Sequence, residues 1–146
     1  MDSSDIPVNN SAMIAFLPTT SAWCNIDLPH MTLVYAGAID KLKPSDYNEL
    51  AKAASSISLL TNPFSAEVSK VDVFGDTDQV YVLKFRLTPE LQAIRNYVEQ
   101  WNKSEYSFNP HATIGPATEP LGVTPDFVFF DRVMVAWGDD RMTFKL

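Results

Sequence analysis

The sequence predicts a single α+β domain in which two helices accompany about six to eight strands. Two segments show the spacing of apolar side chains that is typical of helices, and several short segments show strand patterns bounded by turn residues. A chain of 146 residues is long enough for one domain with a substantial core and too short for two ordinary domains. No linker divides it, so we expect a flexible polar tail over residues 1–11 and one folded domain over residues 12–146.

The first strands are predicted from apolar runs and alternation. Residues 12–17 are typical of a buried strand, and residues 29–37 are rich in β-forming side chains and end at a glycine. The twelve or so residues between them are polar and contain two prolines, so we expect a loop there. Residues 64–74 and 80–87 are expected to pair as a hairpin around a turn at residues 75–78.

The strand over residues 80–87 alternates clearly, so its two faces differ. The expected apolar face consists of Tyr81, Leu83, Phe85 and Leu87. The expected opposite face consists of Val82, Lys84 and Arg86.

The two helices have recognisable starts. The first is expected to begin at Pro44-Ser45-Asp46, and its apolar positions are Leu50, Ala53, Ala54 and Ile57. The second is expected to have Thr88 as N-cap and Pro89 as first helical residue. Its apolar stripe consists of Leu91, Ile94, Val98 and Trp101.

The C-terminal third is predicted to be mostly strand. A polar loop over residues 102–109 leads into a strand over residues 110–115. Residues 126–137 and 141–146 are expected to form a closing hairpin around Gly138-Asp139-Asp140.

The charge balance argues against a long nucleic acid as partner. The chain has 11 basic and 18 acidic residues, a net charge of −7, and no basic cluster. Proteins that grip long RNA or DNA neutralise many phosphates with Lys and Arg. A small nucleotide or cyclic oligonucleotide needs only a few local donors and is the partner we expect. The sequence leaves the oligomeric state open.

Cellular context is indicated by cysteine usage and hydropathy. The chain has one cysteine, Cys24, which cannot form an internal disulfide and agrees with a reducing compartment. No apolar run reaches the length of a membrane span, and the first residues are acidic, unlike a secretory signal. We therefore expect a cytoplasmic protein, in the host cytoplasm if it is viral, without a membrane partner.

Both histidines of the chain occur in the same local pattern. One stands in Pro29-His30-Met31-Thr32-Leu33 and the other in Pro110-His111-Ala112-Thr113-Ile114. Side chains two apart on a strand share a face, about 6–7 Å from each other. Each histidine therefore shares a face with the threonine that follows it, while the intervening apolar residues face the core. If the two polar faces meet, two imidazoles and two hydroxyls converge on one small pocket.

That set of side chains suits cleavage of a phosphodiester. Histidine, with an ordinary pKa of about 6.5, can act as base or acid near neutral pH, so two imidazoles can divide the work. Threonine hydroxyls can donate hydrogen bonds to non-bridging phosphate oxygens, where transition-state charge accumulates. We therefore predict His30, Thr32, His111 and Thr113 as catalytic residues. No metal or other cofactor is required by this chemistry.

The paired His-x-Thr-aliphatic motifs, with a helix after the first, resemble those of the 2H phosphoesterase superfamily, also called LigT-like. The resemblance covers roughly residues 12–146 and implies a bilobal α+β fold, with two antiparallel sheets facing a central groove and helices outside. It implies action on 2′,3′-cyclic phosphates, RNA ends, ADP-ribose cyclic phosphate or cyclic oligonucleotide messengers. Small phage members of this superfamily include anti-CBASS enzymes, which degrade cyclic nucleotides of bacterial immunity.

The sequence departs from the bacterial RNA-processing members, because Gly115-Pro116-Ala117 stands where an arginine follows the second motif. Together with the short, acidic chain, this favours a compact nucleotide. The expected function is a metal-independent phosphodiesterase that cleaves a cyclic nucleotide or a short (cyclic) oligonucleotide, such as an immune second messenger. The alternatives are a 2′,3′-cyclic phosphodiesterase for RNA or ADP-ribose ends and a non-catalytic nucleotide-binding sponge.

Other interpretations of the histidines remain open. One alternative is that both histidines are structural, with ring nitrogens hydrogen-bonded to the backbone. This would explain a single motif more easily than two matching ones. A catalytic zinc site needs a third protein ligand, and neither motif has a further Cys or His nearby.

Four further residues are predicted to bind substrate. Trp23, in the loop before the first motif, could stack on a base or cap the core. Phe108 lies just before the second motif and could reach the mouth of a groove. Lys84 and Arg86 share one strand face and could hold phosphates or lie in solvent.

Overall fold

The computed structural model describes residues 10–146 and confirms the α+β class. Within this range the chain forms seven strands, two α-helices and two short 3-10 helices. The strands are β1 (Ser11–Pro18), β2 (Met31–Ala38), β3 (Phe64–Phe74), β4 (Val80–Phe85), β5 (His111–Pro116), β6 (Phe127–Trp137) and β7 (Asp140–Lys145). The helices are α1 (Pro44–Leu60), α2 (Pro89–Val98), η3 (Ile39–Lys41) and η4 (Glu99–Trp101).

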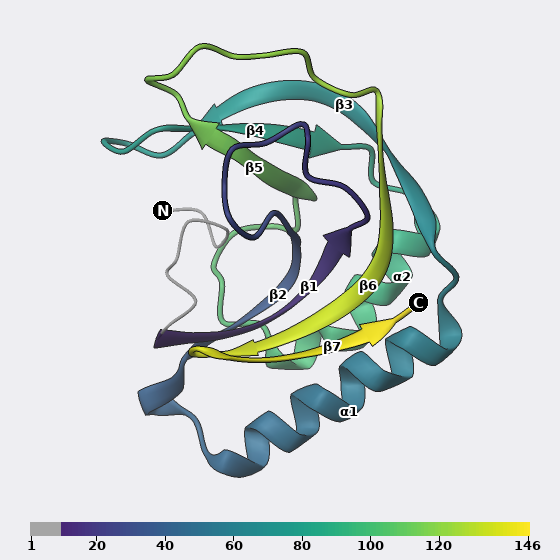
Figure 1. The fold of residues 1–146 in the computed structure, drawn as a ribbon. Helices are drawn as coiled ribbons and strands as arrows, with labels where there is room; N and C mark the ends of the chain where they lie inside the picture. Colours follow the sequence, from purple (N-terminus) through teal and green to yellow (C-terminus); the bar gives the residue numbers. More distant parts are fainter. Residues whose placement is uncertain (1–9) are drawn as a thin grey trace.

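The strands form one antiparallel sheet that closes on itself. Its order is β1-β2-β5-β4-β3-β6-β7, and an additional β1–β6 pairing completes the ring. The long strand β6 pairs with β3 through its first residues and with β1 and β7 through the rest, so it joins two halves of the sheet (Figure 1). Opposite β6, the halves meet again where β2 and β5 pair through Met31 and Ala112 alone.

Both helices lie on the outer side of the sheet and cover the main core (Figure 1). The predicted stripe of α1 is confirmed, because its buried residues are Leu50, Ala53, Ala54 and Ile57. The predicted start of α2 is also confirmed: Pro89 is the first helical residue, and the Thr88 hydroxyl accepts a hydrogen bond from the Leu91 N–H at 3.2 Å. Trp101 lies in η4, just beyond the α-helix.

Strand β1 is buried on both faces and separates two apolar clusters. Ala12, Ile14 and Phe16 belong to the main core beneath the helices. The alternate residues of β1 belong to a smaller cluster on the other face, and this cluster consists of Met13, Ala15, Leu17, Met134 and Ala136. Because Ala15 is the register partner of Thr32, the smaller cluster lies on the face that carries the threonine of the first motif.

One detail of the predicted strand faces is wrong. Tyr81, Leu83 and Phe85 do face the main core, but β4 ends at Phe85 and Leu87 is 42% exposed. The strand ends there because α2 begins directly afterwards, with Thr88 as its N-cap and Pro89 as its first helical residue.

The predicted flexible tail over residues 1–11 falls mostly outside the described residues. The structure describes Asn10 and places Ser11 in β1, one residue before the predicted start of the domain. All described strands join the same sheet. Neither helix within residues 10–146 combines the length and apolarity that a membrane crossing needs.

Candidate active site

The two histidine rings are held by the same local hydrogen bond to the backbone. The Nδ1 atom of His30 lies 2.8 Å from the carbonyl oxygen of Leu28, and the Nδ1 atom of His111 lies 2.6 Å from that of Asn109. A carbonyl oxygen can only accept, so each Nδ1 carries the hydrogen. A proline stands between donor and acceptor in both motifs and restricts the backbone of the turn. Each Nε2 atom is therefore the ring nitrogen that can exchange a proton with a ligand.

The register of β2 and β5 brings the motifs together. Met31 is paired with Ala112, and in an antiparallel pair this sets each histidine opposite the threonine of the other motif. The four motif residues share one face of the strand pair, because both Met31 and Ala112 face the core. In a regular antiparallel ladder such diagonal positions are about 7–8 Å apart, with the Cβ atoms somewhat closer. That spacing leaves room for a phosphate between two imidazole rings.

The four motif side chains are enclosed by packing. His30, Thr32, His111 and Thr113 are 6–8% exposed. The ring of Phe74 contacts that of His111 edge-on, with centroids 4.9 Å apart. The Thr32 hydroxyl lies 3.8 Å from the sulfur of Met13, a weak acceptor. Such contacts reduce the number of rotamers available and pre-organise the side chains.

Lys84 is the register partner of His111 and therefore lies on the same face of the sheet. Its side chain is 22% exposed, and its Nζ lies 3.8 Å from the carboxylate of Asp72. The pKa of Asp72 is lowered, mainly by a hydrogen bond from the Val73 N–H; desolvation opposes this shift, and the charges of Lys70 and Lys84 add to it. Asp72 consequently stays ionised throughout the range in which histidine titrates, and a charged pair stands beside His111.

A cavity of about 510 Å³ opens where β2 and β5 diverge from their one paired position. Thr32 and His111 line one part of it, and Phe74 and the hairpin turn at residues 75–76 form another wall. Residues of the loop over 102–109, Arg95 of α2, residues 33–35 of β2 and Val73 of β3 also line it. The volume falls within the range of small-molecule sites.

Phe108, predicted as a substrate-binding residue, lines this cavity together with Arg95 of α2. The guanidinium of Arg95 lies over the Phe108 ring, 5.4 Å from its centroid. Arg95 and Phe74 were not anticipated from the sequence. Its burial could have been inferred from its spacing: Arg95 is four residues after Leu91 and three before Val98, which places it on the apolar side of the helix.

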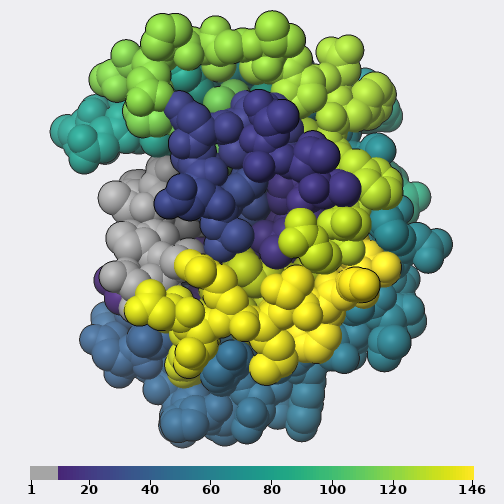
Figure 2. All heavy atoms as spheres, in the orientation of Figure 1, coloured from purple at the N-terminus to yellow at the C-terminus, as the bar shows by residue number. Residues whose placement is uncertain are grey.

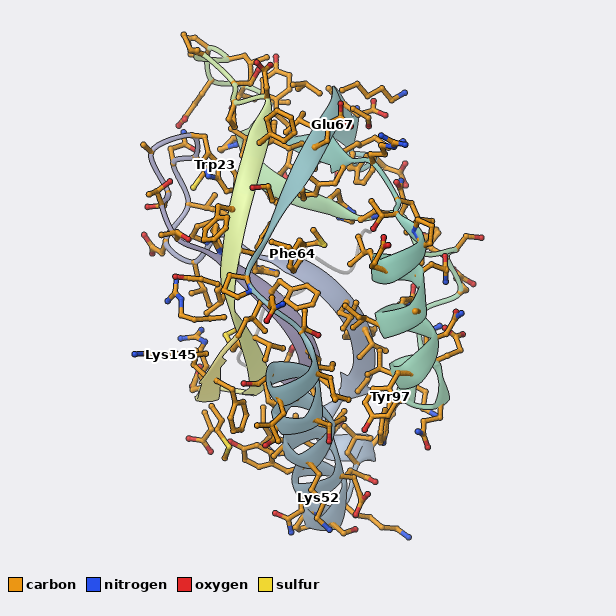
Figure 3. All side chains as sticks on the ribbon, turned by 90° about the vertical axis from the view of Figure 1, so that its right-hand side faces the viewer. Trp23, Lys52, Phe64, Glu67, Tyr97 and Lys145 are labelled. Atoms are coloured by element: carbon orange, nitrogen blue, oxygen red, sulfur yellow. The ribbon has the colours of Figure 1, made fainter. Side chains whose placement is uncertain are left out.

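The predicted substrate-binding residues Trp23, Lys84 and Arg86 do not line this cavity, and neither do the motif residues His30 and Thr113. The Trp23 ring packs against the main core and its Nε1 donates to the Thr20 carbonyl at 3.0 Å. Figure 3 shows Trp23 on the side of β6 away from α2. Arg86 follows the end of β4 and forms an exposed ion pair with Glu67 at 3.4 Å.

The loop between β1 and β2 is anchored on β5, close to the second motif. The Asn25 N–H donates to the Ile114 carbonyl at 3.0 Å, and its side-chain amide donates to Glu119. A Cβ at Gly115 would collide with the Asn25 side-chain oxygen, so the glycine permits this approach. The space-filling view shows the loop, in dark blue, packed beneath the green segment that follows β5 (Figure 2).

Within residues 10–146, no three His, Cys, Asp or Glu side chains converge as metal ligands would.

Comparisons with known proteins agree on one family. A family model described as the 2′-5′ RNA ligase superfamily matches residues 25–126, which include both motifs. A predicted phosphoesterase of Bacillus cereus (strain B4264) is 37% identical over 91 residues, covering 60% of this chain and 51% of the relative. A predicted phosphoesterase of Bacillus thuringiensis (strain Al Hakam) is 36% identical over the same length. The chain spans about half the length of these curated relatives.

Solved structures resemble the fold over nearly the whole chain. Usb1 of Kluyveromyces marxianus superposes with a TM-score of 0.69 at 13% identity, covering 94% of this chain and 99% of that one. E. coli LigT complexed with 3′-AMP superposes with a TM-score of 0.56 at 15% identity, covering 94% and 95%. With the family model matched across both motifs and this fold around them, the chain belongs to the 2′-5′ RNA ligase superfamily.

Proposed function

We propose that this protein is a metal-independent phosphodiesterase in which His30 and His111 act as paired acid and base. The observation that carries the proposal is the shared anchoring of both rings. Each Nδ1 donates to a backbone carbonyl two residues earlier, and the β2–β5 register brings both motifs to one face. Two structural histidines would not need the same tautomer, the same threonine neighbour and a common face.

The proposed reaction needs one proton removed and one proton supplied. The neutral Nε2 of one imidazole takes the proton from water or a sugar hydroxyl, whose oxygen then forms a bond to phosphorus. The bond from phosphorus to the leaving oxygen breaks, and that oxygen receives the proton carried by the other Nε2. Thr32 and Thr113 donate hydrogen bonds to the non-bridging oxygens, where negative charge increases in the transition state.

The proposed substrate is a cyclic nucleotide or a short (cyclic) oligonucleotide, such as an immune second messenger in the cytoplasm. The net charge of −7 and the cavity of about 510 Å³ both favour a compact ligand over a long nucleic acid. Similar solved structures carry small nucleotides, namely 3′-AMP and NADP+ in E. coli LigT and uridine monophosphate in Usb1.

The test is incubation of the purified protein, in EDTA, with cyclic di- and trinucleotides, 2′,3′-cyclic AMP and linear RNA, followed by chromatography of the products. We expect cleavage to continue in EDTA and to be fastest on a cyclic oligonucleotide. Cleavage restricted to 2′,3′-cyclic ends would overturn the substrate assignment. Tight binding without any product would indicate a nucleotide sponge, and loss of cleavage in EDTA would contradict the metal-independent reaction.

The pH dependence of cleavage should identify which histidine is the base. We expect a bell-shaped profile whose two limbs report the coupled pair. Lys84→Gln removes a positive charge beside His111 and leaves Asp72 ionised, so protonation of His111 becomes easier. One limb should therefore move to higher pH by about half a unit, more than the other.

The limb that moves assigns the role. If it is the acidic limb, His111 is the base, and if it is the alkaline limb, His111 is the acid. Lys52→Gln is the matched control, because Lys52 is exposed on α1 and should move neither limb (Figure 3). Equal movement of both limbs, or of neither, would contradict the pairing of Lys84 with His111.

A further inference from the structure

Arg95 is a buried cation on the wall of the candidate site. It lies on α2, is 4% exposed, and lines the same cavity as Thr32 and His111. Burying a guanidinium is strongly unfavourable unless charged or polar partners compensate for the lost water. Most arginines therefore stay at the surface, and a buried one in a cavity wall requires an explanation.

The partners of Arg95 leave part of its guanidinium unused. Within residues 10–146, Glu99 is the one hydrogen-bond acceptor of Arg95, and it takes a bond from Nη1. The Phe108 ring covers a face of the guanidinium but accepts no in-plane N–H. A guanidinium has five N–H donors, so Nε and Nη2 keep theirs. Neither atom is among the enclosed, unpartnered side-chain nitrogens, so these donors reach accessible space.

That space is the cavity, which joins Arg95 to the motif residues. Phe108, under the guanidinium, is followed by Asn109, whose carbonyl holds the ring of His111. The cavity volume of about 510 Å³ exceeds what one phosphate between the histidines would occupy. Among the lining residues within 10–146, Asp76 on the hairpin turn is the one that carries a carboxylate. A ligand that fills the cavity therefore meets His111 and Thr32 at one end and the Arg95 guanidinium at the other.

We propose that Arg95 and Phe108 form a second anion subsite, which takes a phosphate next to the one held between His30 and His111. The free donors of a guanidinium match two oxygens of a phosphate in one plane. The substrate would then carry at least two phosphates, as a short linear or cyclic oligonucleotide does and a 2′,3′-cyclic mononucleotide does not. This inference rests on the proposed function for the position of the first phosphate.

The test measures binding and needs no turnover. Isothermal titration calorimetry in EDTA at fixed ionic strength compares adenosine 3′,5′-bisphosphate with 3′-AMP, which lacks the second phosphate. Wild type should bind the bisphosphate at least about tenfold more tightly. Arg95→Met should weaken bisphosphate binding by about tenfold to a hundredfold and change 3′-AMP binding by less than about twofold.

Matched variants separate a local effect from net charge and from folding. Arg141→Met removes the same charge from an exposed position on β7 and should leave both affinities unchanged. Thermal unfolding checks the fold of Arg95→Met, which replaces a buried cation by an apolar chain of similar length. Arg95→Lys keeps the charge but loses the planar donor pair, and should weaken bisphosphate binding by an intermediate factor.

Several results would overturn the subsite. These are equal weakening of both ligands by Arg95→Met, no weakening in either Arg95 variant, an equal effect of Arg141→Met, or a wild type that does not prefer the bisphosphate. If Arg95→Met fails to fold, Arg95→Lys decides alone. A preserved bisphosphate preference without any hydrolysis would refute the proposed enzyme and leave the subsite standing.

Discussion

Replacing either His30 or His111 by alanine is expected to lower kcat by about 10²–10⁴-fold, the range that general acid and general base catalysis by a positioned side chain commonly reaches. The two imidazoles transfer protons in the same chemical step, so the loss of either one slows that step. The double variant should therefore be about as slow as the slower single variant, since residues that act as a unit are not additive. Single-turnover rates in EDTA, with enzyme in excess over a cyclic dinucleotide, provide the measurement.

Asparagine variants are the matched control for this prediction. Alanine removes both the reactive Nε2 and the hydrogen bond from Nδ1 to the backbone carbonyl of Leu28 or Asn109. His30→Asn and His111→Asn retain an N–H donor near the Nδ1 position and lack the second nitrogen. They should be as slow as the alanine variants and more stable to heat. A loss of less than about tenfold in any of these variants would contradict the acid–base roles.

Replacing Thr32 or Thr113 by valine is expected to lower kcat by about 10²–10³-fold, with little change in KM. Each hydroxyl is proposed to donate to a phosphate oxygen, and that bond strengthens as charge accumulates in the transition state. Valine keeps the β-branched shape that these buried strand positions accommodate. In Thr32 the lost bond to the Met13 sulfur is weak, so stability should change little.

Serine variants test whether the hydroxyl is responsible. Thr32→Ser and Thr113→Ser keep the donor and lose a methyl group, so they should recover most of the rate. Steady-state kinetics on the same cyclic dinucleotide separates kcat from KM. A rise in KM with unchanged kcat would mean that the threonines bind the ground state and the transition state equally well.

Local signals explain why so much of the fold could be predicted. Thr88 and Pro89 mark the start of α2 through interactions within one turn, and the structure begins the helix there. The predicted strand over residues 64–74 agrees with β3 at both ends. The prediction for Leu87 was wrong because alternation continues in sequence after the strand has left its partner.

The predicted substrate-binding residues show where sequence reasoning stops. Lys84 and Arg86 are two residues apart, so alternation places both on the same strand face and the sequence pattern cannot distinguish them. Only the β4–β5 register sets Lys84 opposite His111, while Arg86 lies past the end of β4 and pairs with Glu67. Arg95 is a residue that sequence reasoning missed. Because it is charged, the apolar pattern does not include it, although it is buried on the apolar side of α2.

The sequence by itself determined the local conformations and the chemistry carried by each Pro-His-x-Thr motif. Turns, caps and face alternation depend on neighbours within a few residues, whose sterics and hydrogen bonds are present in any fold. Only the tertiary structure decided which faces meet: one residue pair between β2 and β5 joins the motifs, and the divergence beyond it opens the cavity toward Arg95. Those contacts join segments that are far apart in the chain. They are determined by strand register and helix docking, which depend on the packing of the whole core.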